Sequence, residues 1–157
     1  MCGFLVYIDL TDGVDTAAFA RALTRLNHRG PDDEGFAASA DCSGVSFHDR
    51  TSFLALPAAH RPRLAMGHKR LSIVDLTSAS RQPCVDERGR SAMVFNGEIY
   101  NYRDLSRRAE TAHSDTLTLF DHLNHGGIDH LSRLNGMWGF AYTDIDSGKM
   151  FLSRDRY

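Results

Sequence analysis

The order of the predicted elements constrains the fold of this chain more than any other feature of its sequence. Apolar, β-branched and aromatic runs predict strands at 2–8, 64–69, 92–95, 137–145 and 149–153. The last two flank Asp146-Ser147-Gly148, which predicts a hairpin turn. Helices do not separate these strands regularly, as they would in a parallel sheet. The pattern therefore favours an α+β fold in layers, built from antiparallel sheets.

Helical signals are fewer and lie between the strands. A first helix, capped by Asp15 or Thr16, is predicted to end before Gly30. The other helical segments are predicted at 102–109, at 115–124 with Ser114 as N-cap, and as a short turn at 128–134. The remaining signals are a loop at 29–35 and short strand-like pieces at 45–48 and 52–56.

Size, charge and hydropathy exclude several classes of protein. At 157 residues the chain fits one domain with a sizeable core. Its net charge of −2 gives no general reason to expect nucleic acid or an anionic membrane as a partner. No apolar run approaches the roughly 20 residues needed to cross a bilayer. The apolar start lacks a basic flank and is a poor signal peptide, so we expect a cytoplasmic protein.

The three cysteines are Cys2, Cys42 and Cys84. An odd count without a C-x-x-C pair argues against a disulfide framework or a zinc knuckle, so we expect Cys42 and Cys84 to be small apolar residues. Cys2 differs, because removal of Met1 would give it a thiol and a free α-amino group. That amine, with a reference pKa of roughly 7.7–8.0, can act as general base for the thiol.

The pair Asn96-Gly97 follows a predicted strand and allows two interpretations. Nucleophilic attack on an amide creates a tetrahedral oxyanion, which the Asn96 side chain and the Gly97 backbone N–H could stabilise. The same pair between strands is also a strong signal for a hairpin turn. From this pair alone, the turn is favoured.

Arg70 and Asp115 suit the two charged groups of a free amino acid. A guanidinium pairs with an α-carboxylate, and a carboxylate pairs with an α-ammonium. Asp115 is predicted in the first turn of a helix, where the helix dipole helps to keep it ionised. The simpler interpretation is a surface ion pair or a capping contribution, usually worth under about 1 kcal/mol.

Several short motifs occur in a fixed order over nearly the whole chain. They are MCG at 1–3, RGPDDEG at 29–35, GHKRLSIVDL at 67–76, QP at 82–83, NGEIYN at 96–101, SDT at 114–116, LNGM at 134–137 and RDR at 154–156. In this order they resemble the N-terminal glutaminase domain of glutamine-hydrolysing asparagine synthetases. Those domains are class II glutamine amidotransferases.

The resemblance implies an α+β fold, a four-layer αββα sandwich of antiparallel sheets called the N-terminal nucleophile hydrolase fold. It implies that Cys2, exposed by loss of Met1, attacks the side-chain amide of glutamine, with Asn96 and Gly97 as the oxyanion hole. The glutamine-binding residues that it implies are Arg70, Leu71, Ser72, Ile73, Val74, Asn96, Gly97, Glu98 and Asp115.

In the resembled family, the ammonia passes to a synthetase domain that amidates aspartate with ATP and magnesium. The sequence contains no Ser-Gly-Gly-x-Asp-Ser loop, so we expect no ATP site, cofactor or metal in this chain. We expect residues 1–157 to be one glutaminase domain, incomplete at its C-terminus, that works with a synthetase domain in cis. A homodimer is compatible with this assignment, and another carboxylate acceptor is an alternative.

The sequence also departs from the family pattern. Residues 36–66 form a longer connection than usual, which predicts a surface insertion. Leu117 replaces an acidic residue that would complete a capping box with Ser114, and segment 101–113 is short. These changes leave a second hypothesis open, in which the domain is a non-catalytic interaction or regulatory module. Retention of the five residues Cys2, Arg70, Asn96, Gly97 and Asp115 argues for catalysis.

Histidines in the second half raise the question of a metal site. His122 and His125 are three residues apart on a predicted helix, and Asp121 and Asp129 offer oxygen ligands. The spacing matches no strong zinc motif. Solvated histidines on a helix are therefore the favoured interpretation.

Overall fold

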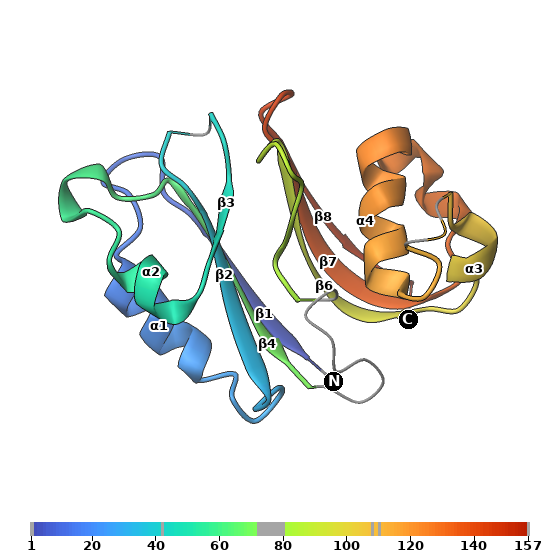
Figure 1. Cartoon of the computed structure of the whole chain (residues 1–157), viewed down its shortest axis with the longest axis horizontal. Coiled ribbons are helices and arrows are strands. Elements are labelled where there is room, and N and C mark those ends of the chain that lie inside the picture. Colours follow the sequence, from blue (N-terminus) through green and yellow to red (C-terminus); the bar gives the residue numbers. More distant parts are fainter. Residues whose placement is uncertain (1, 42, 72–80, 108, 110, 157) are drawn as a thin grey trace.

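The computed structural model describes residues 2–41, 43–71, 81–107, 109 and 111–156, and shows two antiparallel sheets stacked between helices (Figure 1). The first sheet has the strand order β1-β4-β2-β3, with β1 (Gly3–Ile8), β4 (Leu64–Arg70), β2 (Asp33–Ser39) and β3 (Ser46–His48). The second has the order β5-β6-β7-β8, with β5 (Cys84–Val85), β6 (Ser91–Ile99), β7 (Gly136–Asp144) and β8 (Lys149–Arg154). The antiparallel prediction is confirmed.

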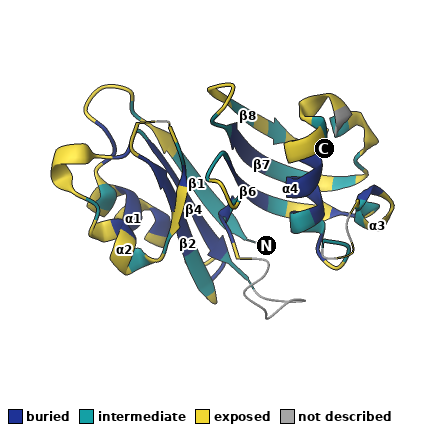
Figure 2. Ribbon diagram, turned by 45° about the horizontal axis from the view of Figure 1, so that its top comes forward, coloured by how far each residue is buried: buried dark blue, intermediate teal, exposed yellow. Residues whose placement is uncertain are grey.

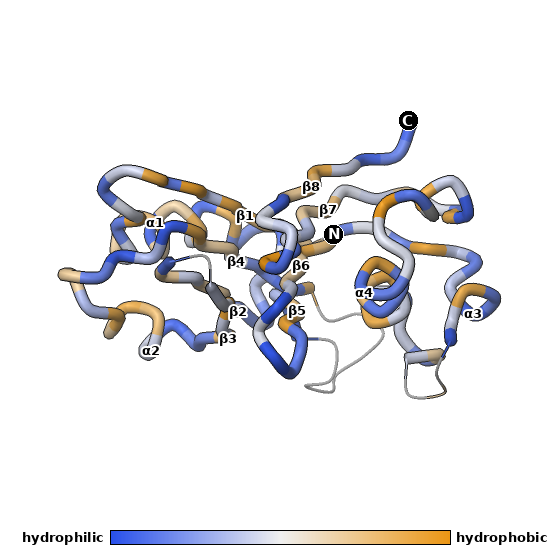
Figure 3. Tube along the Cα trace, turned by 90° about the horizontal axis from the view of Figure 1, so that it is seen from above, coloured by the Kyte–Doolittle hydropathy of each residue, from blue (hydrophilic) through white to orange (hydrophobic). Residues whose placement is uncertain are grey.

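Helices cover the outer face of each sheet. The first sheet carries α1 (Thr16–Thr24) and α2 (Arg50–Leu54), and the second carries α3 (Tyr102–Leu105) and α4 (Asp115–Gly126) (Figure 1). Two 3-10 turns complete the described elements, η1 (Ala58–His60) and η3 (Ile128–Arg133). Seen from above, the two halves of the sandwich lie side by side (Figure 3).

Three apolar clusters fill the spaces between these four layers. One lies between the first sheet and its helices and includes Phe19, Leu23, Phe36 and Phe53. The central one joins the sheets and includes Ala37, Met66, Val94 and Ala141. The third lies under α4 and includes Phe95, Leu119, Leu123 and Phe140. Buried positions accordingly follow the central strands of both sheets (Figure 2). The predicted αββα sandwich is confirmed.

Side-chain caps begin the two longer helices, as predicted. The Asp15 carboxylate accepts the Ala18 N–H at 2.8 Å at the start of α1. The Ser114 hydroxyl accepts the Leu117 N–H at 3.3 Å at the start of α4. The cap at Ser114 therefore forms without the acidic partner that Leu117 replaces.

Three predicted elements differ from the structure, one in type and two in their bounds. Residues 52–56 were expected to be strand-like, but they overlap α2, whose first turn is capped by Asp49 and whose Phe53 is buried. A short apolar run does not distinguish a strand from a buried helical turn. The predicted loop 29–35 ends early, because β2 begins at Asp33 and pairs with Arg70. The helix at 102–109 is shorter, since α3 ends at Leu105.

The hairpin-turn interpretation of Asn96-Gly97 is also wrong. Strand β6 continues to Ile99, and within it Asn96 pairs with Gly139 and Gly97 with Trp138 on β7. Nine consecutive pairs with β7 outweigh the local turn preference of two residues. The predicted strand 92–95 therefore extends past the residues that were expected to end it.

None of the helices in the described part of the chain is long and apolar enough to cross a membrane.

Candidate active site at one end of the sandwich

The start of β1, the end of β4 and the end of β6 lie at the same end of the sandwich (Figure 1). The predicted residues of the site fall on these three strand ends and on the first turn of α4. Cys2 directly precedes β1, Arg70 ends β4, and Asn96 and Gly97 lie near the end of β6. Residues far apart in sequence thus reach one region of the molecule.

Cys2 is half-buried, is not in a disulfide, and lies against the end of β4. The Leu71 backbone N–H donates to Cys2 Sγ at 3.4 Å. In the β1–β4 register Gly3 pairs with Lys69, so the next position places Cys2 beside Arg70. The register of two strands therefore fixes the thiol next to the residues predicted to bind substrate.

The segment 29–35 packs against the start of β1 and the end of β4. A Cβ atom at Gly3 would lie 3.1 Å from Arg29 Cβ, and one at Gly30 would overlap the Lys69 backbone. The Asp32 N–H donates to the Arg70 carbonyl oxygen at 3.1 Å. The two glycines therefore allow the backbone after α1 to pack directly against β1 and β4.

The open edge of β6 presents backbone donors. Backbone N–H groups alternate in direction along a strand. The Phe95 N–H donates to Gln82 Oε1 at 2.6 Å, and the Ile99 N–H donates to Asp115 Oδ2 at 3.2 Å, so both point away from β7. Gly97 lies two residues from both Phe95 and Ile99, so its N–H has the same direction as theirs. Its N–H therefore points to the same edge.

Asp115 lies in the first turn of α4 and reaches this edge through its carboxylate. Besides contacting Ile99, it accepts the Thr116 N–H at 2.7 Å through Oδ1. These contacts hold the carboxylate two residues from Gly97 along β6. A negative charge is thus placed at the helix N-terminus, where the helix dipole stabilises it.

His68 links the two sheets beside the site. It lies on β4, is 1% exposed, and its Nε2 is 3.2 Å from the Phe95 carbonyl oxygen on β6. Because a carbonyl can only accept, Nε2 carries the hydrogen. Burial lowers the pKa of His68 to about 4, so the imidazole is neutral near pH 7.

The buried His68 predicts a loss of stability in mild acid. Its pKa is about 4 when folded and 6.5 ordinarily, so the unfolded chain takes up the proton first as the pH falls. We expect its contribution to be present above pH 6.5 and lost towards pH 4, by up to about 3 kcal/mol. Urea unfolding across this range measures the loss. A His68→Gln chain with the same pH dependence as the unmodified chain would contradict this origin.

Not every predicted residue can be placed at the site. Ser72, Ile73 and Val74 lie outside the described residues. Glu98 lies exposed on β6, paired with Met137. The predicted residues that the structure places at this end are Cys2, Arg70, Leu71, Asn96, Gly97, Glu98 and Asp115.

Two further residues, His68 and Gln82, contact the site backbone but had no predicted role. Both belong to motifs in the sequence, GHKRLSIVDL and QP. Both are polar and nearly fully buried, with 1% and 7% of their surface exposed. For His68, a polar residue inside an otherwise apolar strand pattern was the available signal, but the shared partner of both residues, Phe95, could not be read from the sequence.

A charge cluster stabilises the neighbouring part of the first sheet. Glu34 Oε2 contacts Lys69 Nζ at 2.5 Å, and Arg50 Nη2 donates to the same carboxylate at 2.9 Å. The hydrogen bond from Arg50, with that from Lys69, lowers the pKa of Glu34 to about 2. The cluster ties α2, β2 and β4 together, and Lys69 directly precedes Arg70.

The other candidate sites give no support to different chemistry. Cys84 is buried, and burial raises the pKa of its thiol to about 12, which agrees with a small core residue. Among the described residues, no three His, Cys, Asp or Glu side chains come together as a metal site would require. His125 contacts Asp121 within α4, with Nδ1 3.4 Å from Oδ1.

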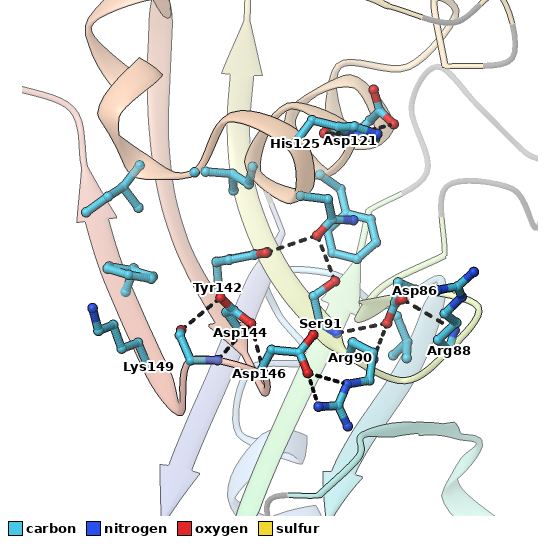
Figure 4. Close-up of a pocket in the computed structure, with 18 of the residues that line it drawn as sticks. Asp86, Arg88, Arg90, Ser91, Asp121, His125, Tyr142, Asp144, Asp146 and Lys149 are labelled. Atoms are coloured by element: carbon cyan, nitrogen blue, oxygen red, sulfur yellow. Dashed lines mark hydrogen bonds and ion pairs between the residues drawn. The ribbon is translucent and has the colours of Figure 1, made fainter.

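An open groove of about 1230 Å³ lies elsewhere, beside α4 on the outer face of the second sheet (Figure 4). Asn124 Oδ1 accepts hydrogen bonds from Ser91 Oγ at 2.7 Å and from the Tyr142 hydroxyl at 3.0 Å. Charged residues, including Arg90 and Asp146, also line the groove. None of the predicted site residues lines this groove, so its size does not bear on the site at Cys2.

Comparison with protein families identifies one match. The model of the glutamine amidotransferase domain matches residues 56–157, about two thirds of the chain. This region contains the end of β4, the whole of β6 and the start of α4. It therefore includes every predicted site residue except Cys2.

Relatives of known name match the whole chain. A protein of Mycobacterium tuberculosis, provisionally named a glutamine-hydrolysing asparagine synthetase, is 32% identical over 100% of this chain and 24% of its own length. Asparagine synthetase 1 (glutamine-hydrolysing) of Bacillus subtilis is 28% identical over 100% of this chain and 23% of its own length. The chain thus spans about a quarter of the length of these relatives.

A solved structure shares the fold. Glutamine phosphoribosylpyrophosphate amidotransferase of Bacillus subtilis, determined with ADP and GMP, superposes with a TM-score of 0.71. The match covers 99% of this chain and 37% of that chain, at 18% sequence identity. At this identity the likeness establishes the common αββα sandwich.

Proposed function

Because the chain belongs to the glutamine amidotransferase domain family, we propose that it hydrolyses glutamine to glutamate and ammonia with Cys2 as nucleophile. One observation carries the proposal. Cys2 Sγ lies against the Leu71 N–H at the end of the sandwich where β6 directs the Gly97 N–H to its open edge. This arrangement supports Cys2 as the nucleophile and the Gly97 N–H as an oxyanion donor, with the α-amine of Cys2 in the place of a histidine base.

The first half of the reaction forms a thioester. After removal of Met1, the free α-amine of Cys2 takes the thiol proton, and Sγ attacks the side-chain amide carbon of glutamine. The Gly97 N–H and the Asn96 side chain donate to the resulting oxyanion. When the intermediate collapses, the carbon–nitrogen bond breaks and the α-ammonium returns the proton to the leaving ammonia.

The second half releases glutamate. Water attacks the thioester carbon, the same two donors stabilise the second oxyanion, and the carbon–sulfur bond breaks to restore the Cys2 thiol. The base that takes the proton from water is again the α-amine. One residue therefore supplies the nucleophile of the first step, the leaving group of the second, and the general base of both.

Substrate recognition is assigned to Arg70 and Asp115. Arg70 would bind the α-carboxylate of glutamine through its guanidinium, and Asp115 would bind the α-ammonium. The two Asp115 oxygens already contact Ile99 and Thr116, which fixes the carboxylate beside β6. Leu71, Ser72, Ile73, Val74 and Glu98 complete the proposed pocket.

The names of the relatives support a use for the ammonia. We propose that it is supplied to a synthetase domain that amidates aspartate with ATP and magnesium. An acceptor other than aspartate is the alternative within the same chemistry. No residue described in this chain distinguishes the two acceptors.

Purified chain tests the proposal directly. Intact mass measures whether Met1 has been removed, and glutamate and ammonia are quantified with L-glutamine as substrate. We expect equal amounts of both products, and none from D-glutamine, which cannot place both charged groups on Arg70 and Asp115. A folded chain that begins at Cys2 and releases no glutamate would overturn the assignment.

A further inference from the structure

We propose that His68 and Gln82 are positioning residues that hold Asn96 and Gly97 in place relative to Cys2. The inference rests on the proposed function and assigns a role to two residues outside its nucleophile, oxyanion donors and substrate clamp. Both side chains bond the backbone of Phe95, the residue immediately before Asn96. They act on the reaction through that backbone.

Among the described residues, no strand pairs with the edge of β6 beside Asn96. Strand β5 pairs with β6 only through Cys84–Met93 and Val85–Ala92. Two residues further in the same register, Gln82 lies opposite Phe95, and its side-chain oxygen accepts the Phe95 N–H at 2.6 Å. A side chain thus replaces the missing strand at this position.

The carbonyl group of Phe95 is bonded from the other sheet. His68 on β4 donates from Nε2 to this oxygen at 3.2 Å. Both backbone polar groups of Phe95 are therefore fixed by buried side chains. The peptide bond that begins at this carbonyl leads directly into Asn96, so its orientation sets where the Asn96 side chain starts.

His68 also connects these donors to the nucleophile. It lies three residues before Leu71, whose N–H contacts Cys2 Sγ. On the far side of Gly97, Asp115 bonds Ile99 N–H. The oxyanion donors are consequently tied to β4 on one side and to α4 on the other, while β7 holds the opposite edge of β6.

Loss of these bonds has a kinetic signature. Oxyanion donors act chiefly on the transition state, and small displacements of such groups reduce the rate strongly. In the proposed function, Arg70 and Asp115 bind the substrate, and neither side chain takes part in the two bonds to Phe95. We therefore expect kcat to fall while KM stays nearly constant.

The experiment compares His68→Leu, which removes the donor, with His68→Gln, which offers an amide N–H in a similar place. Active sites are counted by covalent titration with a chloromethyl ketone analogue of glutamine. For His68→Leu we expect kcat per titrated site to fall roughly 10- to 100-fold, with KM within about threefold. His68→Gln should recover most of kcat. His48→Leu, on the distant strand β3, is the matched control and should keep full kcat.

Gln82→Met removes the acceptor for the Phe95 N–H at similar volume and decides the question if His68→Leu does not fold. Unchanged kcat per titrated site in the folded variants, or equal losses in His68→Leu and His68→Gln, would overturn the positioning role. If the unmodified chain is titrated but makes no glutamate, the proposed function itself fails and takes this inference with it. A loss confined to the variants supports both.

Discussion

Replacing Cys2 with alanine is expected to abolish glutamine hydrolysis, by a factor on the order of 10³ or more. The variant keeps a free α-amine after removal of Met1, but it has no atom that can form the thioester. The half-buried position of Cys2, held by the Leu71 N–H at 3.4 Å, suits a small side chain, so the fold should be retained. Glutamate release, together with circular dichroism of the purified variant, measures both effects.

Cys84→Ala is the control for this change. Cys84 is 6% exposed and its thiol has a pKa of about 12, so it remains protonated and unreactive near neutral pH. We expect Cys84→Ala to retain kcat and to lose only a modest amount of stability, about 1 kcal/mol. A thiol reagent should label Cys2 before Cys84. Hydrolysis that persists in Cys2→Ala would show that another group is the nucleophile.

The layered fold could be predicted because the apolar, β-branched and aromatic runs of the sequence coincide with most of its strands. Strands β1, β4, β7 and β8 begin and end within one or two residues of their predicted bounds. Where apolar runs are short, as around Phe53, local sequence does not distinguish helix from strand. There the cap at Asp49 and burial against the first sheet decide the structure.

The residue types of the candidate site could be predicted from the sequence, but the contacts that hold its backbone in place could not. The interpretation of Asn96-Gly97 shows the difference. Local turn preference was misleading, because the pairing of these residues with Gly139 and Trp138 depends on a strand some 40 residues away in sequence. The bonds of His68 and Gln82 to Phe95 likewise span 27 and 13 residues. Contacts of this kind follow from the pairing of distant strands and the stacking of the two sheets, which no local pattern encodes.

Gly97→Ala should strongly reduce both activity and stability. A Cβ atom at Gly97 would overlap the Met137 carbonyl oxygen and lie 2.7 Å from Trp138 Cα, and the φ of +159° is unfavourable for a side chain. β7 would have to move, which we expect to cost about 1–3 kcal/mol. The displaced N–H would no longer meet the oxyanion, so kcat should fall by about 10² or more.

Gly139→Ala provides a matched control one residue away in the β6–β7 ladder. Gly139 pairs with Asn96, yet a Cβ atom there has no neighbour within 4 Å. The same methyl group should therefore be tolerated, with kcat and the free energy of unfolding nearly unchanged. Steady-state kinetics and urea unfolding of the two variants separate the effects. If Gly97→Ala lost stability but kept kcat per folded site, the Gly97 N–H would not be the oxyanion donor, because a backbone displaced enough to destabilise the strand could not still hold it in place.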